Sequence, residues 1–257
     1  MDKSINYPFI YIASLMRTGS TVVQEALTER PYSYIFHEPQ LCRNQFAIKD
    51  KYLKEVKDFN IRKLLRPPTT ENFAKNVVPK MKRKIKQIGV KEIENRGWKN
   101  YVKYFPDLKI ILTGRDPRDI YISVHYWFAK KKTNKWKNGR VLTPKVLFEG
   151  LNKDFQMQKE MHKEYGAIKI KYEDLCLHPE ETLKIMKEFV NSPIPNVGKI
   201  GSFLSNNPKR LWEYELHKEE ITNSRVNRWR RETDKQLVKR ANKFFGLMNE
   251  YREFWNY

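Results

Sequence analysis

The sequence predicts an α/β fold in three layers, with a parallel sheet of about five strands and helices on both faces. Five short apolar runs rich in β-forming residues alternate along the chain with segments whose apolar residues recur at helical spacing. Parallel strands need a crossover between them, usually a helix, and such sheets are covered on both faces. At 257 residues the chain has the length of one large domain of this class. We therefore expect a single domain over residues 1–257.

The first strand and the first helix enclose a small polar turn. Phe9–Ala13 is an apolar run of strand length, and the apolar residues of Val22–Leu27 recur at helical spacing. Between them lies Ser14–Thr21, which contains Gly19. The order strand, tight turn, helix points backbone N–H groups and the positive end of a helix dipole at one spot. This arrangement suits a phosphate or a sulfate.

Side chains of this turn add to the predicted anion site. Gly19 lets the backbone close around an anion, Arg17 supplies a charge, and Ser20 and Thr21 supply hydroxyl donors. A nucleoside-triphosphate loop of the form G-x-x-x-x-G-K-[ST] places a lysine directly after its second glycine. Here Ser20 takes that position and the cation comes earlier, as Arg17. The pattern therefore argues against ATP or GTP chemistry.

A second pair of ionisable residues follows the second predicted strand. Tyr34–Phe36 reads as a short strand that runs into His37 and Glu38. Open α/β sheets bind ligands at the carboxyl ends of their strands. One strand–helix–strand step separates Arg17 from Glu38, so we expect the two to face each other across adjacent strand ends. Glu38 is the candidate general base, His37 is the alternative, and a solvated Glu-Pro turn is the non-functional interpretation.

The next segment is charged, low in glycine and interrupted by prolines. We interpret residues 43–87 as an insertion of short helices that helps to shape an acceptor site. Its basic run Lys80–Lys86 is either a solvated helix face or a patch that binds a polyanion. Ile88–Ile93 is the third predicted strand, and Asn95–Phe105 is a predicted helix. Lys91 either forms an ion pair at the strand end or contacts the bound anion or the acceptor.

The fourth predicted strand leads into a second anion motif. Lys109–Thr113 is the clearest buried strand, and the following helix has Asp116 as its predicted N-cap and Pro117 as its first residue. Arg115 at the strand end and Ser123 on the helix offer a forked guanidinium and a hydroxyl, which suit phosphate oxygens. A capped helix with ordinary ion pairs is the alternative interpretation.

The rest of the chain completes the alternation. Ala167–Lys171 predicts the fifth strand, Tyr172 follows it directly, and residues 179–190 predict a helix. Residues 191–223 are rich in Pro, Gly, Ser and Asn at their start, and we expect a second insertion there that acts as a lid. Leu237–Tyr251 has the apolar spacing of one amphipathic closing helix.

Composition limits the partners. The formal net charge is +21, from 51 basic and 30 acidic residues, and it favours anionic partners such as nucleotides, acidic glycans, nucleic acid or a membrane surface. Cys42 and Cys176 form neither a disulfide framework nor a metal pattern, so we expect no bound metal and a reducing, cytoplasmic location. Residues 1–12 lack the features of a signal peptide, and no apolar stretch reaches about 18 residues, so we expect no transmembrane segment.

Both anion motifs resemble one enzyme family. Arg17–Thr21 after a strand resembles the 5′-phosphosulfate loop of sulfotransferases that use 3′-phosphoadenosine 5′-phosphosulfate (PAPS). The stretch from Arg115 to Ser123 is similar to the 3′-phosphate site of the same enzymes. The segments Phe36–Leu41 and Gly89–Glu92 resemble carbohydrate sulfotransferases. Further resemblances lie in Tyr-Glu-Asp-Leu from Tyr172 and in the basic stretch of residues 224–231.

This resemblance implies a P-loop nucleotide-binding-like fold and an enzyme that transfers a sulfonate from PAPS to a hydroxyl, with a carbohydrate as the favoured acceptor. It implies Glu38 as the base, Arg17 as the catalytic cation and no nucleic-acid partner. The residues that it assigns to the nucleotide are Arg17, Thr18, Gly19, Ser20, Thr21, Arg115, Ser123, Tyr172, Ser224 and Arg228.

Two other functions share some of these features. A P-loop kinase-like phosphotransferase has the same predicted architecture, but the loop of this chain lacks the lysine. A non-catalytic polyanion-binding protein explains the net charge, but it does not explain why two arginines follow strand ends. The loops carry no motif that separates polysaccharide, lipid-linked sugar, small-metabolite and tyrosine acceptors.

Overall fold

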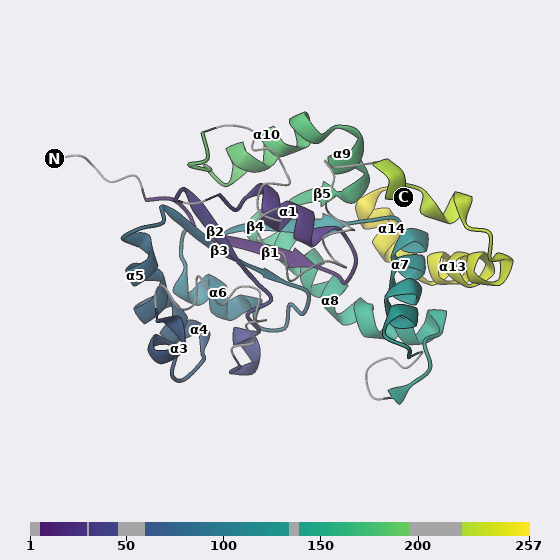
Figure 1. Cartoon of the computed structure of the whole chain (residues 1–257), viewed down its shortest axis with the longest axis horizontal. Helices are drawn as coiled ribbons and strands as arrows, with labels where there is room; N and C mark the ends of the chain where they lie inside the picture. The colour runs from purple at the N-terminus through teal and green to yellow at the C-terminus, as the bar shows by residue number, and fades with distance from the viewer. Residues whose placement is uncertain (1–5, 30, 46–59, 134–138, 196–222) are drawn as a thin grey trace.

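The computed structural model describes residues 6–29, 31–45, 60–133, 139–195 and 223–257. Its centre is a five-stranded sheet in the order β2-β3-β1-β4-β5, and every pairing between neighbouring strands is parallel (Figure 1). The predicted α/β class with a parallel sheet of about five strands is confirmed. The strands are β1 (Ile10–Ser14), β2 (Ser33–His37), β3 (Gln87–Glu92), β4 (Lys109–Gly114) and β5 (Ile168–Lys171).

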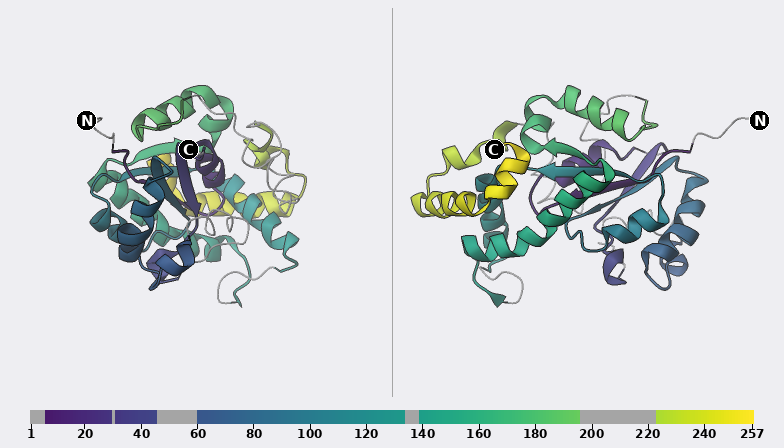
Figure 2. Two further views of the ribbon diagram at one scale, coloured as in Figure 1. Left: turned by 60° about the vertical axis from the view of Figure 1, so that its left-hand side comes forward. Right: turned by 180° about the vertical axis from the view of Figure 1, so that it is seen from behind.

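Side-chain alternation along the strands divides the core into two layers. In β1, Ile10 and Ile12 pack with α1, α9 and α10, whereas Tyr11 and Ala13 pack into a larger cluster on the opposite face. Figures 1 and 2 show helices on both sides of the sheet, as a three-layer fold requires. The helices of the first face are α1 (Ser20–Ala26), α9 (Tyr172–Leu177) and α10 (Pro179–Phe189).

The opposite face is covered by helices from three parts of the chain. Apolar residues from most of these elements form one cluster with Tyr11 and Ala13 of β1. α7 also packs against α13 there, where the rings of Tyr121 and Phe244 lie 5.6 Å apart. The helices are α3 (Ile61–Leu64), α4 (Thr70–Asn72), the π-turn Phe73–Val77, α5 (Val78–Lys82), α6 (Trp98–Tyr104), α7 (Pro117–Lys130), α8 (Pro144–Tyr165), α13 (Lys235–Leu247) and α14 (Asn249–Trp255).

The predicted start of α7 is confirmed. The side chain of Asp116 accepts a hydrogen bond from the backbone N–H of Arg118 at 2.8 Å, and Pro117 is the first helical residue. This cap fixes where the chain turns from β4 into the helix, because it satisfies an N–H group that has no partner within the helix.

Two features of the helices differ from the sequence expectation. The long helix α8 was not predicted, although Thr143 caps it and Leu147, Leu151 and Phe155 recur at helical spacing on its buried side. The single closing helix is two helices, because Met248 leaves the helical conformation between α13 and α14. The break lets Tyr251 and other aromatic residues of α14 pack onto the carboxyl end of β4.

The strand order corrects one expectation about the site. β3 lies between β2 and β1, so Glu38 after β2 does not follow a strand adjacent to that of Arg17. The chain leaves β2, passes through residues 43–87 and returns into the middle of the sheet. Lys91 of β3 therefore takes the place beside Glu38, because a parallel strand inserted here aligns Lys91 with His37.

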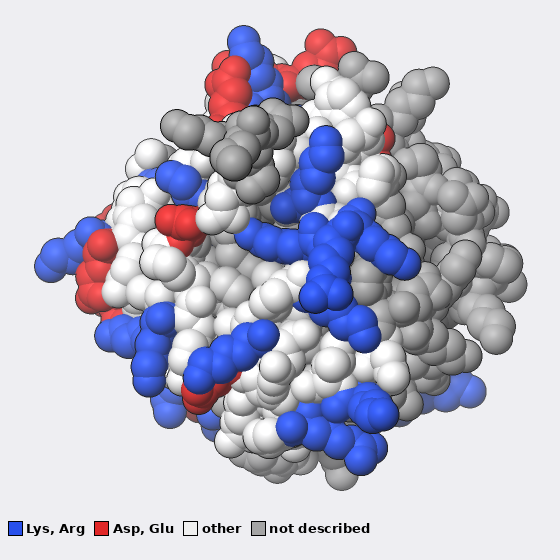
Figure 3. Space-filling model, turned by 90° about the vertical axis from the view of Figure 1, so that its left-hand side faces the viewer, with Lys and Arg blue, Asp and Glu red and all other residues white. Residues whose placement is uncertain are grey.

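The two predicted insertions lie partly outside the described residues. In residues 43–87 the described part forms short helices, and residues 46–59 lie outside it; of the predicted lid region 191–223, residues 196–222 lie outside it. The exposed basic residues of Lys80–Lys86 directly precede β3 and thus lie at the amino edge of the sheet. Figure 3 views the end of the molecule that carries α5 and shows lysine and arginine side chains gathered there.

Candidate functional site

The loop between β1 and α1 has the backbone geometry of an anion cradle. Arg17 has φ 69° and Gly19 has φ 86°, both in the left-handed region, and Gly19 is the N-cap of α1. A Cβ atom added to Gly19 would lie 2.4 Å from Cδ2 of Tyr172. Only glycine therefore lets the loop pass beneath the Tyr172 ring, and the N–H groups that begin α1 are left without helical acceptors.

The side chains of this loop point in different directions. Nε of Arg17 donates a hydrogen bond to the hydroxyl of Ser123 on α7 at 2.9 Å. The hydroxyl of Thr18 is buried, donates to the carbonyl of Leu15 at 2.8 Å and lies 2.6 Å from the hydroxyl of Thr113. Thr18 can therefore reach an anion through its backbone N–H but not through its hydroxyl.

Arg115, which follows β4, is held by several neighbouring groups. One terminal nitrogen donates to the carbonyl of Arg225 at 2.7 Å and lies 3.6 Å from Asp119, and the guanidinium lies 4.3 Å from the centre of the Tyr172 ring. The residue is 5% exposed, and its Nε has no hydrogen-bond partner among the described residues. Buried donors are normally satisfied, so this Nε fits an oxygen of a bound phosphate.

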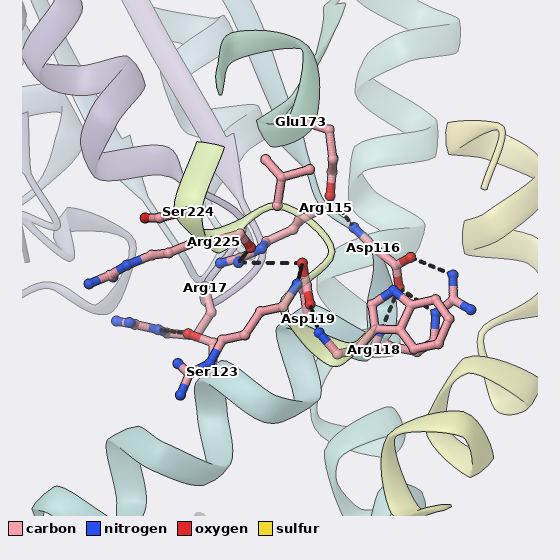
Figure 4. A network of polar contacts seen from close by, with 12 residues as sticks. Arg17, Arg115, Asp116, Arg118, Asp119, Ser123, Glu173, Ser224 and Arg225 are labelled. Carbon is pink, nitrogen blue, oxygen red and sulfur yellow. Dashed lines mark hydrogen bonds and ion pairs between the residues drawn. The ribbon is translucent and has the colours of Figure 1, made fainter. Parts of the chain in front are cut away.

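Asp119 links this arginine to the C-terminal part of the chain. Its carboxylate accepts hydrogen bonds from the backbone N–H groups of Arg228 at 3.3 Å and Trp229 at 2.9 Å. Burial raises the pKa of Asp119, and the charge of Arg115 opposes that rise. Figure 4 shows Arg17, Arg115, Asp119, Ser123 and Arg225 converging from three separate segments of the chain. The network therefore places the basic segment after residue 223 beside the two predicted anion motifs.

A cavity of about 430 Å³ opens beside this network. The guanidinium of Arg228 stacks 4.2 Å above the ring of Tyr126, whose hydroxyl donates to Glu232 at 3.0 Å. Three arginines and the hydroxyl of Ser224 give the cavity the positive charge and the donors that a nucleotide phosphate needs. Its lining residues are Tyr126, Ser224, Arg225, Arg228, Arg231 and Glu232.

Glu38 belongs to a second polar cluster at the same edge of the sheet. The ammonium of Lys91, itself 1% exposed, lies 2.5 Å from Oε1 of Glu38, and Nε2 of His37 lies 3.3 Å from the same oxygen. Nδ1 of His37 lies 2.7 Å from Oε1 of Gln24, whose Nε2 donates to the carbonyl of Ile35 at 2.9 Å. Because the amide oxygen of Gln24 only accepts, Nδ1 of His37 carries a proton and Nε2 faces the Glu38 carboxylate.

Comparison with known families agrees with this geometry. The family model described as the sulfotransferase domain matches residues 8–253 of the chain. The chain belongs to the sulfotransferase family. It is accordingly an enzyme that transfers a sulfonate group, and its donor is PAPS.

Solved structures share the fold of this sulfotransferase. The sulfotransferase domain of the Synechococcus PCC 7002 olefin synthase is 17% identical, with a TM-score of 0.63 over 95% of this chain and 96% of that chain. A mouse sulfotransferase in complex with PAP, the desulfonated nucleotide, is 15% identical, with a TM-score of 0.50 over 96% and 85%. A retinol dehydratase in complex with retinol and PAP is 15% identical, with a TM-score of 0.50 over 93% and 80%. A sequence comparison with curated proteins gave no match.

The sulfotransferase structure gathers most of the residues that the sequence singled out. Those assigned to the nucleotide surround the β1 and β4 ends and the cavity beside them, whereas Glu38 lies with Lys91 at the ends of β2 and β3. Sequence reasoning missed Arg225, although it lies in the recognised basic stretch. It also missed Gln24, a buried polar residue on the apolar side of α1, and Glu92, which ends the buried strand β3.

None of the helices in residues 6–29, 31–45, 60–133, 139–195 and 223–257 combines the length and apolar character that a bilayer crossing requires.

Proposed function

We propose that this sulfotransferase, as one domain over residues 1–257, transfers a sulfonate from PAPS to a carbohydrate hydroxyl by in-line displacement. The observation that carries the proposal is the contact between the two predicted nucleotide motifs. Arg17 after β1 touches Ser123 on the helix after β4, and β1 and β4 are neighbours in the sheet. One nucleotide that carries a phosphate at each end of an adenosine spans such a pair of sites.

The nucleotide is held by charge and by backbone donors. Arg17 and the N–H groups of residues 18–21 bind the 5′ side. Nε of Arg115, which has no partner within the part of the chain that the structure describes, and the hydroxyl of Ser123 bind the 3′-phosphate. Tyr172, Ser224 and Arg228 complete the pocket. In the displacement the acceptor oxygen forms a bond to sulfur as the bond from sulfur to the 5′-phosphate oxygen breaks. Arg17 lies where it neutralises the charge that develops on that phosphate.

Glu38 accepts the proton of the acceptor hydroxyl. The adjacent ammonium of Lys91 favours the ionised carboxylate, which is the form that takes up a proton. His37 is less suited to this role, because one ring nitrogen is bonded to Gln24 and the other faces Glu38. The ammonium of Lys91 therefore orients the carboxylate, and it stands where it also balances charge near the reacting oxygens.

A carbohydrate acceptor is supported by two observations. The segments that carry Glu38 and Lys91 resemble those of carbohydrate sulfotransferases, and a net charge of +21 favours acidic glycans. Transfer of radiolabelled sulfonate from PAPS onto polysaccharides, long-chain alcohols and tyrosine peptides tests the proposal. We expect label on polysaccharide and none with Arg115→Ala at low PAPS concentration. Label on alcohols or peptides alone would refute the acceptor class and leave sulfonate transfer intact.

A further inference from the structure

The last two residues of β3 hold the turn that carries Glu38 at three points. The carbonyl of Lys91 accepts the backbone N–H of Glu38 at 2.7 Å, and the ammonium of Lys91 contacts the Glu38 carboxylate at 2.5 Å. At the third point, Oε1 of Glu92 accepts the backbone N–H of Gln40 at 2.9 Å. The first two contacts act on Glu38 itself, and the third acts on the far end of the turn.

This turn has an unfavourable backbone conformation. Glu38 has φ 48° and Gln40 has φ 56°, so two residues with side chains occupy the left-handed region within three positions. Such residues persist where surrounding contacts hold them, and they cluster at functional sites. Loss of the hydrogen bond to the N–H of Gln40 would destabilise this backbone conformation, and the Glu38 carboxylate would then be less well oriented.

Glu92 is a buried hydrogen-bond acceptor. It is 2% exposed, and the groups that face it are the N–H of Gln40, the carboxylate of Glu38, the ammonium of Lys91 and the hydroxyl of Tyr101 on α6. Burial, reinforced by the nearby charge of Glu38, raises the pKa of Glu92 to about 8, against smaller opposing effects of Gln40, Lys91 and Tyr101. The carboxyl is therefore protonated at neutral pH and accepts the hydrogen bond without a charge.

We infer that Glu92 is a positioning residue for the sulfonate-transfer reaction, which holds the turn of residues 38–40 through the amide of Gln40 and so aims Glu38 at the acceptor hydroxyl. The inference rests on the proposed role of Glu38 as the base. It assigns to Glu92 no contact with the donor, because the residues assigned to the nucleotide lie after β1, β4 and β5, on α7 and in the C-terminal segment.

A pair of variants separates the acceptor oxygen of this side chain from its volume. Glu92→Gln keeps an oxygen acceptor of the same reach, and Glu92→Leu removes the acceptor but keeps much of the volume. We expect Glu92→Gln to retain kcat within about threefold and Glu92→Leu to lose about 10²-fold, the loss that a displacement of about 1 Å produces at a reacting group. PAP affinity, measured by calorimetry, stays unchanged in both, and exchange of the Gln40 amide hydrogen speeds up in Glu92→Leu alone.

Asp154→Leu is the matched control for loss of a buried carboxyl, since Asp154 accepts the backbone N–H of Asn95 at 2.7 Å. It should lower stability without changing exchange at Gln40. Equal losses of kcat in Glu92→Gln and Glu92→Leu, or unchanged Gln40 exchange in Glu92→Leu, would overturn the inference. Near-normal turnover in Glu38→Gln would instead refute the assigned base, and the exchange result at Gln40 does not depend on that outcome.

Discussion

Replacement of Gly19 by alanine tests the anion cradle most directly. Gly19 has φ 86°, and a Cβ atom there would lie 2.4 Å from Cδ2 of Tyr172, which is well inside van der Waals contact. An alanine in the left-handed region costs about 1–2 kcal/mol, and forcing an extra carbon into a packed site costs about 1–3 kcal/mol. We therefore expect Gly19→Ala to lower the free energy of unfolding by about 2–5 kcal/mol.

Gly166 supplies a control for the backbone term. It has φ 59° at the end of α8, and a Cβ atom there meets nothing within 4 Å. Gly166→Ala should lose only about 1–2 kcal/mol, because it carries the conformational cost without the collision. Urea denaturation of both variants at the same pH measures the difference.

The collision also has a functional consequence. The ring of Tyr172 must move away from the loop, and it then loses its contact with the guanidinium of Arg115 at 4.3 Å. A buried contact of this kind contributes about 1–2 kcal/mol, so PAP affinity in calorimetry should fall by about 5–30-fold. If Gly19→Ala matches Gly166→Ala in stability and binds PAP normally, the loop does not pass beneath Tyr172 as described.

Three further predictions follow from the site. Glu38→Gln should lower kcat by about 10²–10⁴-fold with unchanged PAP affinity, because it removes the proton acceptor; near-normal turnover would refute the role. Arg115→Ala should weaken PAP binding by about 10–100-fold in calorimetry, since it removes charge-assisted hydrogen bonds, and an unchanged Kd would contradict the assigned 3′-phosphate site. Burial raises the pKa of Glu92 in the folded protein from 4.5 to about 8, so the unfolded chain loses this proton first and the wild type loses stability as pH rises across that interval. Glutamine does not titrate, so the free energy of unfolding of Glu92→Gln relative to the wild type should rise by up to about 5 kcal/mol between pH 4.5 and pH 8, at about 1.36 kcal/mol per pH unit. Urea denaturation at several pH values measures this difference. A difference that does not change with pH would exclude the buried neutral carboxyl.

The positions of the strands and of both anion motifs follow from local patterns. Apolar runs and turn residues mark β1 and β4, and Arg17 and Arg115 follow them within a few residues. Local sequence determines such features because the contacts that form a strand, a cap or a tight turn join neighbours in the chain. The local pattern predicted that Thr18 lies near the anion. It could not predict that the Thr18 hydroxyl points inward to Thr113, because that contact is made with another strand.

Local sequence patterns were enough to predict that the chain is α/β, that two basic turns follow strands, and that both suit a phosphate. The strand order, which sets Lys91 rather than Arg17 beside Glu38, depends on contacts between distant parts of the chain. Such contacts also bring Asp119 to the amides of residues 228 and 229, and Glu92 to the amide of Gln40. These contacts could not be predicted, because hydrophobic periodicity indicates only which side of a helix or strand is buried. The element that packs against that side depends on crossovers between strands distant in the sequence.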